Sequence, residues 1–390
     1  MSAPRRPGGA LSTVGVEEEF LLVDAVSRTP VPLAREVLER VGDVPGMHGE
    51  LHATQVEFAS GVCTGADELR DQLTEGRRRL ARAAREVGAL LVPAGAPVLG
   101  VTPPPRLEDE RFQRITDLYR GQVADYQCCG CHVHVGVPDQ DTAVAVLNHL
   151  RPWLPTLLAL SVNSPFAHGR DTGFGSWRMV EQSRFPGSGV PPRFTSAAEY
   201  DAAVDRLVAC GVVVDRGMSF WLARLSPRYP TVEVRAADTA ATVDRAVEQA
   251  MLTRALVDRA LADLAEGREG PVLDDQVLAA AVWTAARYGL DGPGVDPWRG
   301  VLVPATDLVA ALSRHTGLPP IKLEDGGARL QRQAAGSSEV HKPASPQELS
   351  GVREIMETGA GGHAKPDLVA VVDALAEVCI GAPEPGNPPW

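Results

Sequence analysis

The segment Thr13–Asp24, TVGVEEEFLLVD, places three consecutive glutamates inside a run of residues that otherwise favours a buried β-strand. Side chains alternate between the two faces of a strand, so Glu18 shares one face with apolar neighbours and Glu17 and Glu19 share the other. Two carboxylates placed in this way lie roughly 6 to 7 Å apart and repel each other when both are ionised. A divalent cation would remove this repulsion, and oxygen ligands at this reach suit Mg²⁺.

The same spacing of polar residues recurs in three further segments that read as strands. The polar pairs are His132 and His134 in GCHVHVG, Glu233 and Arg235 in TVEVRAAD, and Gln55 and Glu57 in HATQVEFASG. In each segment the intervening residues are mostly apolar, which favours one buried face and one polar face. Four such strands would present carboxylates, imidazoles and a guanidinium on one side of a sheet.

Each of these pairs alone has an ordinary structural explanation. A Glu-x-Glu pair is typical of a solvated sheet face, a His-x-His pair of a half-buried structural site, and a Glu-x-Arg pair of a cross-strand ion pair. Together they supply many ligands for a hard cation and few lysines or threonines. The combination therefore favours one shared metal site over four independent, solvent-exposed strand faces.

The rest of the chain predicts an α+β fold with an antiparallel sheet. Long amphipathic helices are expected at residues 66–91 and 242–267, and strands and helices do not alternate in a regular βαβ order. We expect a disordered tail at residues 1–11, a catalytic sheet region at residues 12–270, and a helical part at residues 271–390 packed on the same domain.

Composition and charge limit the classes of partner. The 390 residues carry a formal net charge of -12, which argues against a nucleic-acid partner. The chain has no apolar run long enough to span a membrane, and its first residues lack the apolar core of a secretory signal, which predicts a cytoplasmic protein without membrane contact. We expect the six cysteines to be reduced and mostly buried thiols, since Cys128 and Cys131 have no second pair to complete a zinc ribbon.

Four motifs in a fixed order resemble a known family. GVEEEF, CGCHVHVG, NSPFAHGRDTGFGSWR and VEVRAAD are similar to motifs of the carboxylate–amine ligase branch of the glutamate–cysteine ligase family, type 2. The resemblance covers about residues 12–360. It implies a saddle-shaped antiparallel sheet of about six strands with outer helices, related to the catalytic fold of glutamine synthetase.

The resemblance also implies a reaction. ATP would phosphorylate a carboxylate, expected to be the γ-carboxylate of glutamate, and an amine such as cysteine would attack the acyl phosphate to form an amide. The cofactors would be ATP and two or three Mg²⁺ ions, and the partners small-molecule substrates. A homodimer is implied by the resemblance alone.

Site residues carry over from the family motifs position by position. The implied metal ligands are Glu17, Glu19, Glu50, Glu57, His132 and Glu233. The implied nucleotide contacts are His132, His134 and Arg235, and the implied catalytic residues are Arg235, Glu57 and His134. Because the spacing between Glu50 and Glu57 is odd, a turn or bulge must intervene if both point into one site. The loop 165–194 would hold the acidic substrate through Arg170, Ser176 and Arg178.

Two other functions stay open from the sequence. His-x-His on a strand with acids further along the chain is also a pattern for Zn²⁺, which would make the protein a metal-dependent hydrolase. Glutamates outnumber histidines, however, and this favours a harder metal. The other alternative is a nucleotide-binding protein that has no turnover.

Overall fold

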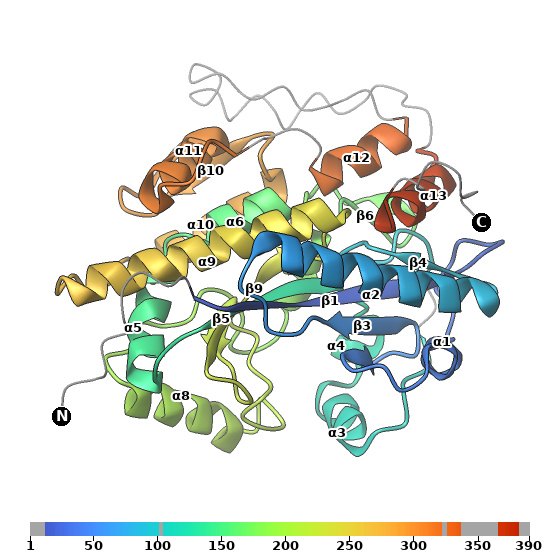
Figure 1. Cartoon of the computed structure of the whole chain (residues 1–390), viewed down its shortest axis with the longest axis horizontal. Coiled ribbons are helices and arrows are strands. Elements are labelled where there is room, and N and C mark those ends of the chain that lie inside the picture. Colours follow the sequence, from blue (N-terminus) through green and yellow to red (C-terminus); the bar gives the residue numbers. More distant parts are fainter. Residues whose placement is uncertain (1–11, 101–103, 322–325, 337–365, 382–390) are drawn as a thin grey trace.

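The computed structural model describes residues 12–100, 104–321, 326–336 and 366–381. Its centre is a seven-stranded antiparallel sheet in the order β2-β3-β1-β5-β9-β8, with β4 paired to the end of β1 (Figure 1). The strands of this sheet are β1 (Val14–Asp24), β2 (Met47–Gly49), β3 (Gln55–Ala59), β4 (Ala89–Val92), β5 (Gly130–Gly136), β8 (Ala223–Leu225) and β9 (Thr231–Asp238). The predicted α+β class is confirmed, with one strand more than expected. The tail predicted at residues 1–11 lies outside the described residues.

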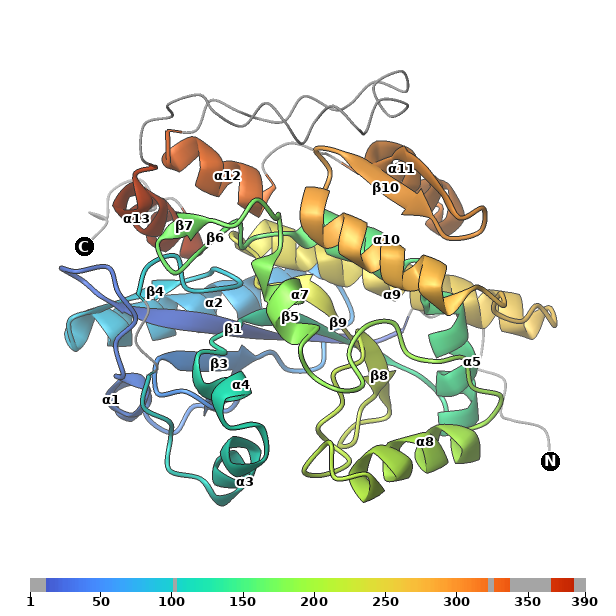
Figure 2. The same ribbon diagram turned by 180° about the vertical axis from the view of Figure 1, so that it is seen from behind.

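Helices cover both faces of the sheet. They are α1 (Ala34–Val41), α2 (Ala66–Glu86), α3 (Glu110–Tyr119), α4 (Gly121–Ala124), α5 (Gln140–Leu150), α6 (Leu154–Ser161), α7 (Trp177–Gln182), α8 (Ala197–Ala209), α9 (Val243–Ala265), α10 (Asp275–Tyr288), α11 (Ala305–Thr316), α12 (Gly327–Ala334) and α13 (Leu368–Cys379). The long helices α2 and α9 lie across one side of the sheet, and α3, α4 and α8 lie beyond its opposite side (Figures 1 and 2).

Strand β1 alternates as predicted. Val14, Val16 and Phe20 point to the α2 and α9 side and are at most 1% exposed. Glu17 and Glu19 point to the other side. After Phe20 both faces are buried, and Leu21 and Val23 pack in a second cluster with residues of β4 and α13. The same alternation holds in β5, where the valines are buried against the helices and His132 and His134 face the side that carries Glu17 and Glu19.

Glu18 lies on the apolar side of β1 and needs a partner there. The partner is Arg77 of α2, whose Nη2 and Nε lie 2.5 and 3.0 Å from the two carboxylate oxygens. Both side chains are completely buried. Arg77 also donates to the carbonyl oxygens of Ala240, Ala241 and Cys379, so it joins β1 to the segment after β9 and to α13. The sequence pattern did not reveal this ion pair.

The structure differs from the predicted helices in two places: one helix is shorter than expected, and the C-terminal part also contains strands. The helix expected at 66–91 ends at Glu86, and the chain turns at Gly88, whose positive φ of 82° suits glycine, before it enters β4. The C-terminal part, expected to be helical, also contains the hairpin of β10 (Pro293–Asp296) and β11 (Val301–Pro304). A second short hairpin, β6 (Phe166–Ala167) with β7 (Arg170–Asp171), lies in the loop 165–194.

The cysteines agree with the expectation from composition. All six cysteines are free and only Cys210 is exposed. Among the described residues, no helix combines the length and the apolar character needed to cross a membrane.

The Glu18–Arg77 pair gives a stability prediction. Removing one partner by Glu18→Gln or Arg77→Met leaves a buried charge or a set of carbonyl groups without compensation, so each single variant should lose about 3–5 kcal/mol of the free energy of unfolding. The double variant Glu18→Gln/Arg77→Met should lose less than the sum of the single losses, since it buries no unpaired charge. Urea unfolding of the four proteins measures this, and a Glu18→Gln protein as stable as the parent would contradict it.

Candidate functional site

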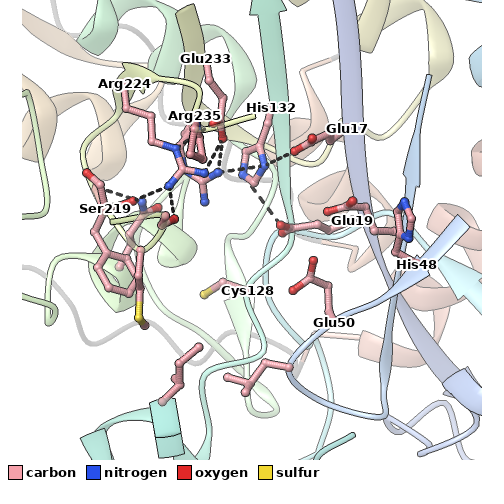
Figure 3. A pocket seen from close by; sticks show the side chains of 18 of the residues that line it. Glu17, Glu19, His48, Glu50, Cys128, His132, Ser219, Arg224, Glu233 and Arg235 are labelled. Carbon is pink, nitrogen blue, oxygen red and sulfur yellow. Dashed lines mark hydrogen bonds and ion pairs between the residues drawn. The ribbon is translucent and has the colours of Figure 1, made fainter. Parts of the chain in front are cut away.

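The polar face of the sheet forms the floor of a cavity of about 640 Å³. Residues from α3, α4, α7 and the segment 215–229 form its walls. Nine of the eleven predicted site residues line this cavity: Glu17, Glu19, Glu50, Glu57, His132, His134, Arg178, Glu233 and Arg235. Figure 3 shows the carboxylates of Glu17, Glu19 and Glu50 pointing into the same space as the Arg235 guanidinium.

One group of potential metal ligands consists of Glu17, His134 and Glu233, whose ligand atoms lie within 4.8 Å of one another. Strand register explains the group, because β5 lies between β1 and β9 and pairs His134 with Glu233. His134 Nε2 lies 3.3 Å from Glu17 Oε1. Its other ring nitrogen, Nδ1, lies 3.0 Å from Thr231 Oγ1, a contact that holds the imidazole with Nε2 facing the cavity.

A second group of potential ligands consists of Glu19, Glu50 and Glu57. Glu19 and Glu57 are directly paired in the register of β1 and β3. Glu50 follows β2, and the chain then turns before β3, as its odd spacing from Glu57 required. The backbone N–H of Gly130 donates to Glu19 Oε2 at 2.6 Å, which fixes that carboxylate beside β5.

The two groups differ in their protonation without a cation. In the second group, burial and the neighbouring Glu50 raise the pKa of Glu19 to about 8. Burial, together with the charges of Glu50, Glu17 and Glu19, raises the pKa of Glu57 well above its usual value. This group therefore holds protons at neutral pH unless a cation replaces them.

The first group stays ionised. Burial raises the pKa of Glu17, but hydrogen bonds from His132 and His134 outweigh it and leave the pKa below its usual value. Burial also raises the pKa of Glu233, and the adjacent guanidinium groups of Arg235 and Arg224 more than offset this effect.

His132 lies between the two groups. Its Nδ1 is 3.5 Å from Glu17 Oε2 and its Nε2 is 3.8 Å from Glu19 Oε1. A β-bulge in the pairing of β5 with β9 places two residues of β9 opposite His132, and it brings Arg235 Nη1 within 3.3 Å of Nδ1. Burial, followed by the charge of Arg235, lowers the pKa of His132 to about 3, so the ring is neutral at pH 7. The compact group around Glu17 contains His134, whereas the family motif assigned the metal to His132.

Arg224 is a site residue that the sequence did not reveal. Its Nε and Nη2 lie 2.7 and 3.1 Å from the two carboxylate oxygens of Glu233, which also pairs with Arg235. Arg224 belongs to β8, which has only three residues and is too short to show an alternating pattern. The only signal was its position shortly before the strand that carries Glu233.

The three residues predicted to bind the substrate lie in different places in the structure. Arg178 is 3% exposed and lines the cavity. Its Nη2 donates to the carbonyl of Arg235 at 3.2 Å, whereas its Nε and Nη1 make no hydrogen bond to any described residue. Ser176 instead caps α7 and donates to Asp238 at 2.7 Å, outside the cavity lining. Arg170 is exposed in β7, and the structure does not bring it to the cavity.

The donor set fits a hard divalent cation. Five carboxylates and one imidazole make up the two groups, and carboxylate oxygens are the preferred ligands of Mg²⁺. The buried Nε2 atoms of His132 and His134 face Glu19 Oε1 at 3.8 Å and Glu17 Oε1 at 3.3 Å, and neither forms a well-aligned hydrogen bond within the described residues. Buried polar atoms without partners are uncommon in native proteins and indicate a missing ion or ligand.

The sequence model of glutamate–cysteine ligase family 2 matches residues 13–363. The chain belongs to this family. A relative from Saccharopolyspora erythraea, which carries the provisional name glutamate–cysteine ligase 2-2, is 53% identical over 341 residues, or 85% of this chain and 86% of the relative. A relative of the same provisional name from Mycolicibacterium vanbaalenii is 47% identical over 308 residues, or 78% of this chain and 84% of the relative. The resemblance inferred from the four motifs is confirmed, and the chain is a glutamate–cysteine ligase-like enzyme.

Two solved structures share the fold. A glutamate–cysteine ligase from Francisella tularensis in complex with AMP superposes with a TM-score of 0.60 at 10% identity, covering 95% of this chain and 93% of that one. A bifunctional glutathione synthetase from Pasteurella multocida superposes with a TM-score of 0.53 at 15% identity, covering 95% of this chain and 52% of that one. These likenesses confirm the glutamine synthetase-like sheet expected from the motifs.

The raised pKa values predict how the metal-free protein responds to pH. The stability that protonated Glu19 and Glu57 contribute is fully present below their unfolded pKa of 4.5 and is lost as the pH rises through the folded pKa, about 8 for Glu19. Below about pH 6.5 the lowered pKa values of His52 and His132 act in the opposite direction, because these histidines gain protons only on unfolding. In a chelator, the melting temperature should therefore fall between pH 7 and pH 8.5, and it should fall less in Glu57→Gln. Differential scanning calorimetry measures both proteins.

Glu86→Gln is the matched control, since Glu86 is exposed at the end of α2. It should follow the wild-type pH profile. A Glu57→Gln variant with that same profile would show that the acidic group carries no raised pKa.

Proposed function

We propose that this protein is an ATP- and Mg²⁺-dependent ligase that joins the γ-carboxylate of glutamate to an amine through an acyl-phosphate intermediate. The observation that carries the proposal is the presence of two acidic groups and a buried guanidinium in one cavity. Phosphoryl transfer requires positioning and charge neutralisation more than covalent help from the protein, and this arrangement provides both. The names of the relatives from Saccharopolyspora erythraea and Mycolicibacterium vanbaalenii support the same reaction class.

Each acidic group would hold one Mg²⁺ ion. Glu17, His134 and Glu233 form one set of ligands, and Glu19, Glu50 and Glu57 form the other. When bound, Mg²⁺ neutralises the negative charge on the phosphates of ATP and on the carboxylate to be activated.

Arg235 and His132 are placed to act on the transferred phosphoryl group. Arg235 is half-buried, and Glu233 pairs with its Nη1, so the guanidinium is held in place before the substrate binds. A fixed cation at this position stabilises the charge that develops as the phosphoryl group leaves ADP. The neutral His132 can donate one ring N–H to a phosphate oxygen without adding a charge.

Arg178 is the residue best placed to bind a carboxylate of the acidic substrate. Its Nε and Nη1 make no hydrogen bond to any described residue, although Nη1 lies 3.8 Å from Asp238 Oδ1. A planar guanidinium binds a carboxylate through two parallel hydrogen bonds. With the substrate held there, the amine attacks the acyl phosphate, and the amide and inorganic phosphate are released.

The ligand chemistry favours magnesium over the zinc of a hydrolase. Each group contains at least two carboxylates, and only the first contains an imidazole. Catalytic zinc sites in proteins instead use mostly histidine or cysteine ligands. Metal analysis after mild purification tests this point, because one tightly bound zinc per chain would support the hydrolase.

Replacement of a metal ligand tests the proposal directly. Glu17→Gln should lower turnover because it removes one negative charge from the cation site. We expect a decrease of about 10²–10³-fold, which is the size of effect seen when one electrostatic contact to a transition state is lost. The fold should remain, since a neutral amide is less costly to bury than a carboxylate. Phosphate release and mass spectrometry of γ-glutamyl adducts measure turnover, and circular dichroism monitors folding. The role as a ligand is refuted by full turnover, or by loss of the fold.

The position of Arg178 can be tested through Gly130. A Cβ atom at residue 130 would lie 2.4 Å from Arg178 Nη2 and 2.8 Å from His132 Nε2, so Gly130→Ala must displace both side chains. We expect the KM for glutamate to rise about tenfold, which corresponds to a loss of about 1.4 kcal/mol of binding free energy. Arg178→Lys should raise this KM by a similar factor. Steady-state kinetics measure the change.

Gly65→Ala is the matched control, because a Cβ atom there meets no atom within 4 Å. It should leave the KM for glutamate unchanged. An unchanged KM in both Gly130→Ala and Arg178→Lys would place the substrate carboxylate elsewhere.

A further inference from the structure

One wall of the cavity is apolar and aromatic, although the floor is acidic. Its cavity-lining residues are Phe112 of α3, Tyr126 after α4, and Met218 and Phe220 of the segment 215–229, and we call them the aromatic wall. All four are half-buried. Phe185 also borders the cavity but is only 2% exposed. Its ring stacks on Phe220 with a centroid distance of 4.4 Å and meets Tyr126 edge-on at 4.8 Å. The wall is therefore built on a packed cluster and is not a chance exposure of single side chains.

The aromatic wall adjoins the place where the acidic substrate would bind. Gln182 lies one turn after Arg178 in α7, and its side-chain amide donates to the carbonyl of Phe220 at 3.3 Å. Tyr126, Arg178 and Glu19 line the same cavity. A molecule lying on the wall would therefore sit beside the activated carboxylate.

Charge at this end of the cavity excludes a second carboxylate. Five arginines line the cavity, and among the described lining residues there is no lysine. Arg224 and Arg235 hold Glu233, and Arg111 pairs with Asp215 at 2.8 Å. Arg228 is exposed and lies next to Tyr229. Among the lining arginines, Arg178 and Arg235 keep a buried N–H group without a hydrogen bond. Arg235 is already paired with Glu233, so Arg178 is the cation left next to the wall, and the glutamate uses it. An amino-acid acceptor would have to bury its own carboxylate without a partner, which is costly.

We propose that the acceptor is a primary amine that carries an aromatic or branched apolar group and no carboxylate, with the apolar group lying on the aromatic wall. This inference rests on the proposed ligase function. The amine nitrogen attacks the acyl carbon of γ-glutamyl phosphate and the C–N bond forms. The bond between the acyl carbon and the bridging oxygen of the acyl phosphate breaks, and its electron pair leaves with inorganic phosphate. The proton lost by the amine goes to solvent.

The nucleobase of ATP has a separate apolar surface available. A neighbouring hollow of about 300 Å³, lined by Leu225, Pro227 and Tyr229, shares the residues 226–229 with the main cavity. Tyr229 lies edge-on to His134 with a centroid distance of 6.1 Å, at the end of the cavity that holds Glu17 and Glu233. A triphosphate that reaches the acidic groups from this hollow leaves the aromatic wall free for the amine.

Pairs of amines that differ in one group test the inference. The full-length protein is assayed for phosphate release and γ-glutamyl adducts with ATP, Mg²⁺, glutamate and each amine. Phenethylamine should have a kcat/KM at least tenfold above that of phenylalanine, which adds only a carboxylate, and at least tenfold above that of ethylamine, which lacks the ring. Cysteamine should likewise exceed cysteine.

Variants of the wall separate the amine from the nucleotide. Phe220→Ala should raise the KM for phenethylamine about tenfold and leave the KM for ATP and glutamate within twofold. Phe112→Ala, which does not disturb the Phe185 stack, should act in the same direction if Phe220→Ala folds poorly. Trp283→Ala is the control, since Trp283 is exposed on α10 and outside the cavity lining.

The outcomes separate this inference from the proposed function. Turnover with cysteine or phenylalanine that equals turnover with the matched amines overturns the inference alone. A raised KM for ATP in both wall variants also overturns it, because the wall would then bind the nucleobase. Absence of phosphate release with every amine overturns the ligase function and the inference together.

Discussion

The buried contact between Glu18 and Arg77 constrains the rest of the structure. Strand β1 carries a carboxylate on each of three consecutive residues, so it has negative charge on both faces, and only one face opens to the cavity. Arg77 supplies the one cation that the apolar side needs. A slip of β1 by one residue would bury Glu17 and Glu19 together against a single guanidinium and leave Glu18 alone in the cavity. The charge pattern thus opposes the wrong register, and the correct register sets where the proposed metal-binding carboxylates lie.

The two acidic groups in the cavity lie close together but differ in protonation. Arginines and histidines keep the group around Glu17 and Glu233 ionised, whereas burial keeps protons on the group around Glu19 and Glu57. The protein therefore avoids a large excess of buried negative charge before its substrates arrive. Cations that enter with ATP would replace the protons, so binding of metal, release of protons and assembly of the site are coupled.

Much of the site could be predicted because it lies on long strands. The period of two placed Glu17, Glu19, His132 and His134 on one side without any knowledge of the fold. The same period fails for Arg224, whose strand is too short, and for the aromatic wall, whose residues come from α3 and from loops and meet only through tertiary packing. Arg170 and Arg178 belong to one loop in the sequence, yet β7 exposes the first and α7 buries the second. Local pattern carries no information about such a separation.

The bond from Arg77 to the carbonyl of Cys379 has a consequence for synthesis of the chain. The guanidinium belongs to the first quarter of the sequence, but one of its acceptors is delivered by α13, about three hundred residues later. While the ribosome is still translating, the centre of the nascent protein holds a cation whose hydrogen bonds are incomplete. The enzyme can reach its final packing only after its last described helix has emerged.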